Sequence, residues 1–182
     1  MRPIMILELN NVVLEGADPK AISLMARSGQ MTCLEGGSAS RCLLAMLGLE
    51  PVVRGFVSVD GEPLLPDTAQ ELRSLMAYAP AQLTAEGEIC VYEPPTVQDI
   101  FSLKANRQAP ISNGIFSEEV RRAGGAELVA VAALLNRPIL LCDNPPASAV
   151  DYLLAQAGKG RVVVVASDAA AYRESAASNY IL

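Results

Sequence analysis

The chain has 182 residues, of which 51% are hydrophobic, and its formal net charge is −6. This length is sufficient for one sizeable core, and we expect a single domain over residues 1–182. The absence of histidine excludes imidazole bases and histidine-ligated metal sites. No cluster of basic residues is present, which disfavours nucleic-acid binding.

The first half of the chain predicts a small antiparallel layer and a strand–loop–helix unit. Residues 4–13 and 56–65 are strand-like, and the second segment carries the hairpin signal Asp60-Gly61. Residues 30–34 predict a buried strand, which leads through a glycine-containing loop to an apolar helix at 43–47. A short helix at 69–75 and a short strand at 76–79 follow.

The second half of the chain predicts buried parallel strands. Residues 139–142 and 162–165 are continuous apolar runs, each followed by an acidic residue and a helix-compatible segment. A helix that opens at Ser117 places an apolar stripe against the core, formed by Leu128, Val131, Ala132 and Leu135. Residues 179–182 predict one more strand. Residues 81–116 are loosely organised, with one helix predicted at 96–103.

The four cysteines, Cys33, Cys42, Cys90 and Cys142, show no C-x-x-C spacing. We therefore expect small buried hydrophobic residues in a reducing compartment rather than a disulfide framework or a zinc site. No segment has the pattern of a signal peptide or the length of a membrane span. These features predict a cytoplasmic chain.

The loop after residues 30–34 stands where a nucleotide-binding protein keeps its phosphate loop. Such loops bind phosphate through backbone N–H groups, the positive end of the next helix and a lysine. Here the loop is about two residues shorter than the GxxxxGK[ST] pattern, and Cys42 and Leu43 stand where a metal-holding hydroxyl is needed. Two interpretations remain open, a turn without a ligand and a degenerate phosphate site. The residues of that site are Gly36, Gly37, Ser38, Ala39, Ser40, Arg41 and Cys42.

Seven segments in order resemble the ATP-binding-cassette (ABC) transporter ATPase family, over nearly the whole chain. They are the Walker A-like loop at 36–44, the hairpin region at 48–64, the strand before Gln82 of the Q-loop, residues 94–100 of the helical subdomain, 132–143 ending in the Walker B residue Asp143, the D-loop at 148–151, and 163–168 of the H-loop strand. The resemblance implies a P-loop NTPase-like mixed sheet flanked by helices. It also implies an N-terminal antiparallel β-layer and a helical subdomain reduced to about residues 83–125.

The departures from the family pattern fall where the family does chemistry. The resemblance implies that Asp143 holds Mg²⁺, but Asn144 replaces the family's glutamate and Ser167 replaces its histidine. A neutral amide cannot accept a proton from water at neutral pH. The signature sequence survives only as residues 122–126, and no aromatic residue at 12–19 can stack on adenine. The sequence thus predicts that no catalytic set is intact.

Three other residues have alternative interpretations. Arg41 is either a replacement cation for the phosphate-loop lysine or a solvated residue in the first turn of the helix. Ser148 and Asp151 are either an ordinary helix start or a contact in a dimer, as the D-loop match implies.

Three functional hypotheses follow. The first is a degenerate ABC transporter ATP-binding subunit that binds Mg-ATP weakly or not at all. It would pair with a membrane permease subunit or another ABC ATPase subunit and be peripheral at the inner face of the membrane. The second is an active ABC-type ATPase with a rearranged nucleotide site, for which Glu86 and Glu88 are the available bases. The third is an unrelated α/β hydrolytic enzyme that uses Asp143, Asp168 and Ser167. The first hypothesis explains why the segments that specify the fold are retained while the family's catalytic residues are replaced.

Overall fold

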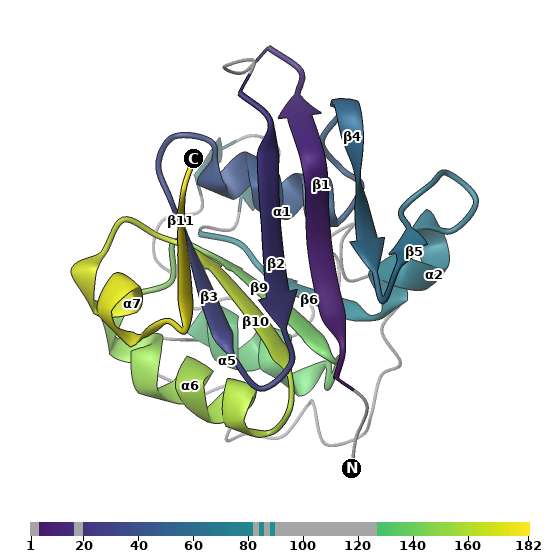
Figure 1. The fold of residues 1–182 in the computed structure, drawn as a ribbon. Helices are drawn as coiled ribbons and strands as arrows, with labels where there is room; N and C mark the ends of the chain where they lie inside the picture. The colour runs from purple at the N-terminus through teal and green to yellow at the C-terminus, as the bar shows by residue number, and fades with distance from the viewer. Residues whose placement is uncertain (1–3, 17–19, 82–83, 86–87, 90–126) are drawn as a thin grey trace.

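The computed structural model describes residues 4–16, 20–81, 84–85, 88–89 and 127–182 (Figure 1). Its strands form an antiparallel sheet and a parallel sheet, apart from a short hairpin of β7 (Thr84–Ala85) and β8 (Glu88–Ile89). The antiparallel sheet has the order β2-β1-β4-β5 and contains β1 (Ile6–Leu14), β2 (Ile22–Arg27), β4 (Val52–Val59) and β5 (Glu62–Pro63). The parallel sheet has the order β11-β3-β10-β9-β6 and contains β3 (Met31–Glu35), β6 (Met76–Ala79), β9 (Ile139–Asp143), β10 (Val162–Ala166) and β11 (Ser178–Ile181).

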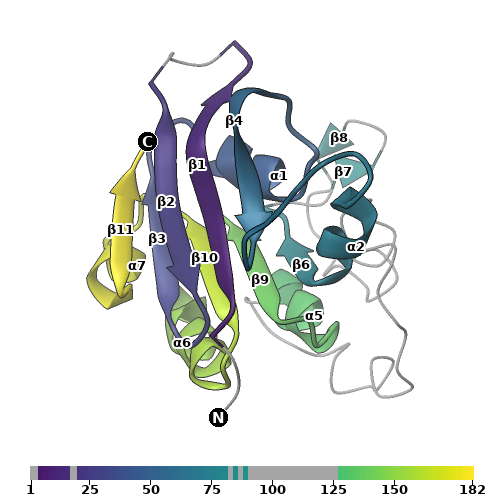
Figure 2. The ribbon, with the colours of Figure 1, turned by 45° about the vertical axis from the view of Figure 1, so that its right-hand side comes forward.

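The helices separate and cover these sheets. They are α1 (Ala39–Met46), α2 (Ala69–Ser74), α5 (Glu127–Leu134), α6 (Val150–Gly158) and α7 (Ala170–Ser175), with a 3-10 turn, η2 (Ala147–Ala149), before α6. Helix α1 lies between the two sheets, whereas α5, α6 and α7 cover the opposite face of the parallel sheet (Figures 1 and 2). The parallel strands are therefore covered on both faces, which explains their continuous apolar sequences.

The predicted parallel strands are confirmed within one sheet. Strand β10 pairs in parallel with β3 on one side and with β9 on the other, and β9 pairs with β6. The last predicted strand is β11, which joins the other edge of β3. The prediction of one mixed sheet is wrong in one respect. Parallel and antiparallel pairing occur in separate described sheets, because α1 fills the space between them.

The predicted hairpin is also confirmed. Strands β4 and β5 pair across the Asp60-Gly61 turn, and both turn residues have positive φ, as two-residue hairpins require. The Asp60 carboxylate accepts a hydrogen bond from the Ile6 N–H at 2.7 Å, which ties the turn to β1. Strand β2 was not predicted, since its apolar run, residues 24–26, has only three residues.

Two helices differ from the predicted pattern. Helix α1 begins at Ala39, four residues before the expected start at Leu43, so the loop before it is shorter than the sequence indicated. In α5, the predicted stripe residues Val131 and Ala132 are buried, but Leu128 is only half-buried. The other buried residues of α5, Val129 and Ala133, show that burial extends beyond one stripe.

Several predictions lie outside the described residues. They concern Gln82, Cys90 and Glu86, the side chain of Glu88, the helix at 96–103, the signature remnant at 122–126, and the helical subdomain at about 83–125.

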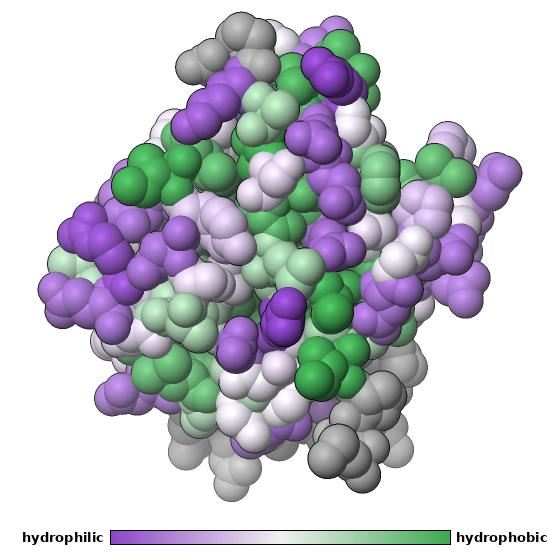
Figure 3. All heavy atoms as spheres, viewed as in Figure 1, coloured by the Kyte–Doolittle hydropathy of each residue, from purple (hydrophilic) through white to green (hydrophobic). Residues whose placement is uncertain are grey.

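Hydrophilic and hydrophobic residues are interspersed over the outer face of β2, β1 and β4 in Figure 3. Among the described residues, the exposed large hydrophobic side chains include Val53 and Phe56 on β4 and Ile181 on β11. None of the described helices has both the length and the apolarity needed to cross a bilayer.

The cysteines at described positions behave as buried hydrophobic residues. Cys33, Cys42 and Cys142 are free thiols inside the core. Burial raises the pKa of Cys42 from 9.0 to about 11, an effect that the neighbouring Arg41 partly opposes. Burial likewise raises the pKa of Cys142. These thiols are neutral in the folded protein.

Stability is expected to fall in alkaline solution because of these thiols. Above pH 9 the unfolded chain ionises its cysteines while the folded chain keeps the Cys42 proton up to about pH 11, so the free energy of unfolding decreases across this window. The decrease is roughly 1.4 kcal/mol per pH unit for each such thiol. Urea unfolding at several pH values measures it. The Cys42→Ala variant should show a shallower slope, and an unchanged slope would contradict the assignment.

Candidate functional site

The loop between β3 and α1 is built tightly around Gly36. This residue has φ +100°, a conformation that glycine adopts readily. A Cβ added at Gly36 would lie 2.1 Å from the carbonyl oxygen of Leu182, so the backbone after β11 lies directly against the loop. The Leu182 N–H also donates to the Glu35 carbonyl at 2.8 Å. Leu182 therefore packs against one side of the loop at Gly36, whereas the next residue, Gly37, is exposed.

The Gly36 N–H is already hydrogen-bonded. It donates to Oδ1 of Asp168 at 2.9 Å, and Asp168 follows the end of β10, the strand next to β3. In a phosphate loop such an N–H would be available to a phosphate oxygen. Here a carboxylate of the same chain is its acceptor.

Asp143 meets a hydroxyl from the start of α1. Oγ of Ser40 donates to Oδ1 of Asp143 at 2.6 Å, and the Tyr78 hydroxyl is 3.5 Å from Oδ2. Burial is the main cause that raises the pKa of Tyr78. The charge of Asp143 and the hydrogen bond to Asp143 raise it further. Cys42 and Leu43 bring no hydroxyl to Asp143, but Ser40 does, because α1 begins at Ala39.

The residue before Ser40 is Ala39, which is 4% exposed and has no charge. Arg41 does not replace the phosphate-loop lysine. Its guanidinium is paired with the Glu50 carboxylate and also donates to the carbonyl oxygen of Glu15. Arg41 does lie in the first turn of α1, and its side chain is 34% exposed, but it is paired rather than simply solvated, and it links α1 to the segments after β1 and before β4.

Asn144 and Ser167 make local contacts. Asn144 has φ +43°, and its side-chain amide donates to Oδ1 of Asp143 at 3.0 Å. Its backbone N–H donates to the carbonyl of Ala166 at 2.8 Å. Ser167 is 6% exposed, and its Oγ accepts a hydrogen bond from the N–H of Ala169 at 3.2 Å. Neither side chain supplies a proton acceptor comparable to a carboxylate or an imidazole.

A second ion pair lies beneath the loop. Oε2 of Glu35 is 2.8 Å from Nη1 of Arg173, while Oε1 of Glu35 is buried and has no partner among the described residues. Burial raises the pKa of Cys33 to about 11. The charge of Glu35 also raises it, Arg173 lowers it, and Asp168 raises it. The base of the loop thus contains two carboxylates, and the nearby Arg173 is paired with one of them.

The other predicted site residues do not join this cluster. No hydrogen bond connects the Ser167 side chain with Asp143 or Asp168 in the described structure, so the unrelated hydrolytic enzyme gains no triad-like arrangement from it. Ser148 lies in η2 and Asp151 in the first turn of α6, and both are exposed. Within the described ranges, no group of three or more cysteine and acidic side chains is arranged to hold a metal ion.

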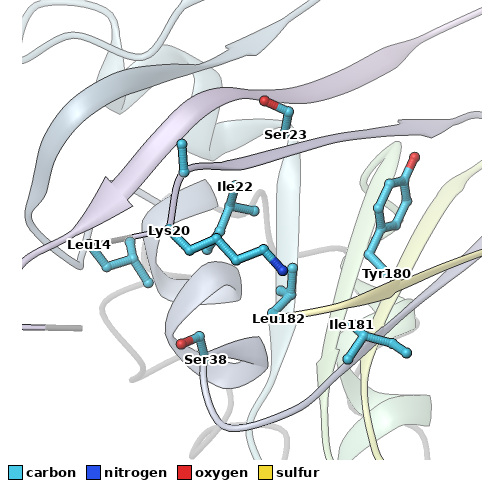
Figure 4. Close-up of a pocket in the computed structure, with 9 residues that line it drawn as sticks. Leu14, Lys20, Ile22, Ser23, Ser38, Tyr180, Ile181 and Leu182 are labelled. Carbon is cyan, nitrogen blue, oxygen red and sulfur yellow. The ribbon is translucent and has the colours of Figure 1, made fainter. Parts of the chain in front are cut away.

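A pocket of about 210 Å³ opens beside the loop (Figure 4). The hydroxyl of Tyr180 at its wall is used elsewhere, since it bonds both the N–H and the carbonyl of Met25 on β2. The Lys20 side chain runs along the pocket toward Leu182. The lining residues are Leu14, Lys20, Ala21, Ile22, Ser23, Ser38, Tyr180, Ile181 and Leu182.

The fold has a clear counterpart among solved structures. The chain is similar to the crystal structure of a nucleotide-free ATP-binding cassette from an ABC transporter, with a TM-score of 0.67 and 14% sequence identity, over 98% of this chain and 87% of the other. Neither a protein-family model nor a curated protein sequence matches the chain. The fold is therefore that of an ATP-binding cassette. At this identity the likeness concerns the fold alone.

Proposed function

We propose that this chain is a degenerate ABC transporter ATP-binding subunit, a pseudo-ATPase that acts as a structural or regulatory partner in a transport complex. The observation that carries the proposal is the missing cation at the phosphate loop. The loop and α1 contain no lysine, and Arg41, their only basic residue, is bound to Glu50. Phosphoryl transfer depends on cancelling charge at the terminal phosphates.

The groups beside the missing cation support the same proposal. Asn144 cannot serve as a general base, whose loss typically costs about 10²–10⁴-fold in rate. Ser167 is occupied in a turn with Ala169. Because these groups act on the same transition state, their losses do not add in a simple way. Together they leave no described set of side chains for hydrolysis at the loop.

Part of a magnesium site persists. Asp143 and Ser40 carry oxygen donors of the kind that Mg²⁺ prefers and would hold the ion if Mg-ATP bound. The ion would neutralise phosphate charge there. In the described structure these two residues bond each other, and the Asn144 amide adds a third contact. We expect Mg-ATP binding to be weak or absent.

The partner role rests on which surfaces remain exposed. Ser148 and Asp151, at the D-loop position, are exposed to solvent. A membrane permease subunit or another ABC ATPase subunit is the proposed partner, and the chain would lie against the membrane through it. Co-purification with a permease or ATPase subunit tests this role.

Calorimetry with Mg-ATP tests the nucleotide part of the proposal. Titration of the purified chain should give little or no heat of binding, and phosphate release should stay at the rate of a protein-free control. The Asp143→Ala variant should give the same result as the native chain. Hydrolysis at an ordinary transporter-ATPase rate that disappears in Asp143→Ala would establish the alternative, an active enzyme with a rearranged site.

A further inference from the structure

Asp168 bonds a backbone N–H of the loop between β3 and α1. Its Oδ1 atom accepts the Gly36 N–H at 2.9 Å. A hydrogen bond between a carboxylate and a backbone N–H is charge-assisted and stronger than a neutral one. An incoming phosphate oxygen would have to displace this carboxylate. Because the carboxylate belongs to the same chain, it does not have to bind from solution.

The negative charge of Asp168 also opposes the entry of a second anion. Glu35 lies at the base of the same loop, and both carboxylates raise the pKa of the buried Cys33 thiol. Arg173 is the cation close to them, and it is paired with Glu35. A phosphate entering the loop would therefore meet a carboxylate already bound to Gly36. The two like charges repel each other, and solvent weakens this repulsion because Asp168 is exposed.

Leu182, the residue after β11, also contacts this loop. The Leu182 carbonyl lies beside Gly36, and the Leu182 N–H is bonded to Glu35. Asp168 itself is positioned by β10, whose pairing with β3 brings Ala166 opposite Leu34. Asp168 is exposed and lies two residues beyond β10, in the short connection to α7.

We infer that Asp168 is an internal ligand of the loop and determines its specificity by excluding phosphate-containing molecules. This inference rests on the proposed function and adds a cause to it. The loop lacks affinity because one of its backbone donors is satisfied by a fixed carboxylate, in addition to lacking a lysine. Removal of the carboxylate should uncover an anion-binding site that includes the Gly36 N–H and the Ser40 end of α1.

Inorganic pyrophosphate without metal is the probe that tests this inference. The full chain and its Asp168→Ala variant are titrated by calorimetry, with ³¹P line broadening as a second readout. We expect the Asp168→Ala variant to bind pyrophosphate at least about tenfold more tightly than the native chain. The Asp168→Asn variant should gain less, because its amide oxygen can still accept the Gly36 N–H while the charge is gone.

Glu174→Ala is the matched control. Glu174 is an exposed acid on α7, close in sequence to Asp168, and its removal changes the net charge equally. This variant should bind pyrophosphate no better than the native chain. Equal gains in Asp168→Ala and Glu174→Ala, or no gain in either Asp168 variant while thermal unfolding shows a folded chain, would overturn the inference. Neither result would alter the expected lack of ATP hydrolysis, which is measured separately.

Discussion

The Asn144→Glu variant is expected to show no detectable ATP hydrolysis. The substitution returns a carboxylate to the end of β9, next to Asp143, where the family resemblance implies a general base. The loop and α1 would still contain no lysine, and Asp168 would still accept the Gly36 N–H. A general base contributes only part of the catalysis of phosphoryl transfer, and the remaining electrostatic groups act on the same transition state.

Phosphate release under saturating Mg-ATP measures this prediction. The new carboxylate would also stand beside Asp143, and two adjacent anions repel each other when no metal ion lies between them. We therefore expect a small loss of stability in Asn144→Glu and no gain in rate. Restoration of turnover by this single change would show that the loop binds and polarises the nucleotide without a lysine.

The Gly55→Ala variant is expected to lower the free energy of unfolding by about 3 kcal/mol. Gly55 has φ +79° and lies where β4 crosses an irregularity in its pairing with β1. A Cβ at this position would come within 2.3 Å of the carbonyl oxygens of Asn10 and Asn11. Both contacts are with backbone atoms, so no side-chain rotation can relieve them.

Gly61→Ala is the control for this prediction. Gly61 has φ +83°, but a Cβ there would meet nothing within 4 Å. The Gly61→Ala variant therefore loses only the free energy needed to hold alanine at positive φ, about 1 kcal/mol. Urea unfolding of both variants separates the two effects. Similar losses in the two variants would show that crowding against β1 is not the cause.

The sequence was sufficient for the elements with strong local signals. The strands around Leu141 and Val164 were predictable because their continuous apolar runs require coverage on both faces. The β4–β5 turn was predictable because Asp60-Gly61 suits a two-residue hairpin. Strand β2 was missed because its apolar run, residues 24–26, is shorter than a typical strand, and β2 is paired on one side only.

The candidate site was less predictable, because its contacts depend on residues distant in sequence. Ser40 meets Asp143 only because the loop is short and α1 begins early. The pairing of Arg41 with Glu50 depends on where the chain emerges after α1. The bond between Gly36 and Asp168 follows from the order of strands in the parallel sheet, which no local pattern specifies.

The strand order also has a consequence for how the chain folds. Strand β3 pairs with β10 and β11, so that Met31 faces Val163 and Cys33 faces Asn179. These pairings close a long stretch of chain between β3 and β10. Closing it costs conformational entropy before the pairing gives any stability, and contacts between residues so distant in sequence slow folding. Strands β1 and β2, in contrast, are neighbours in the chain. We expect the N-terminal antiparallel sheet to form early and β3 to remain unpaired until β10 and β11 are in place. The Tyr180 hydroxyl of β11 then connects the two sheets through its hydrogen bond with Met25 of β2.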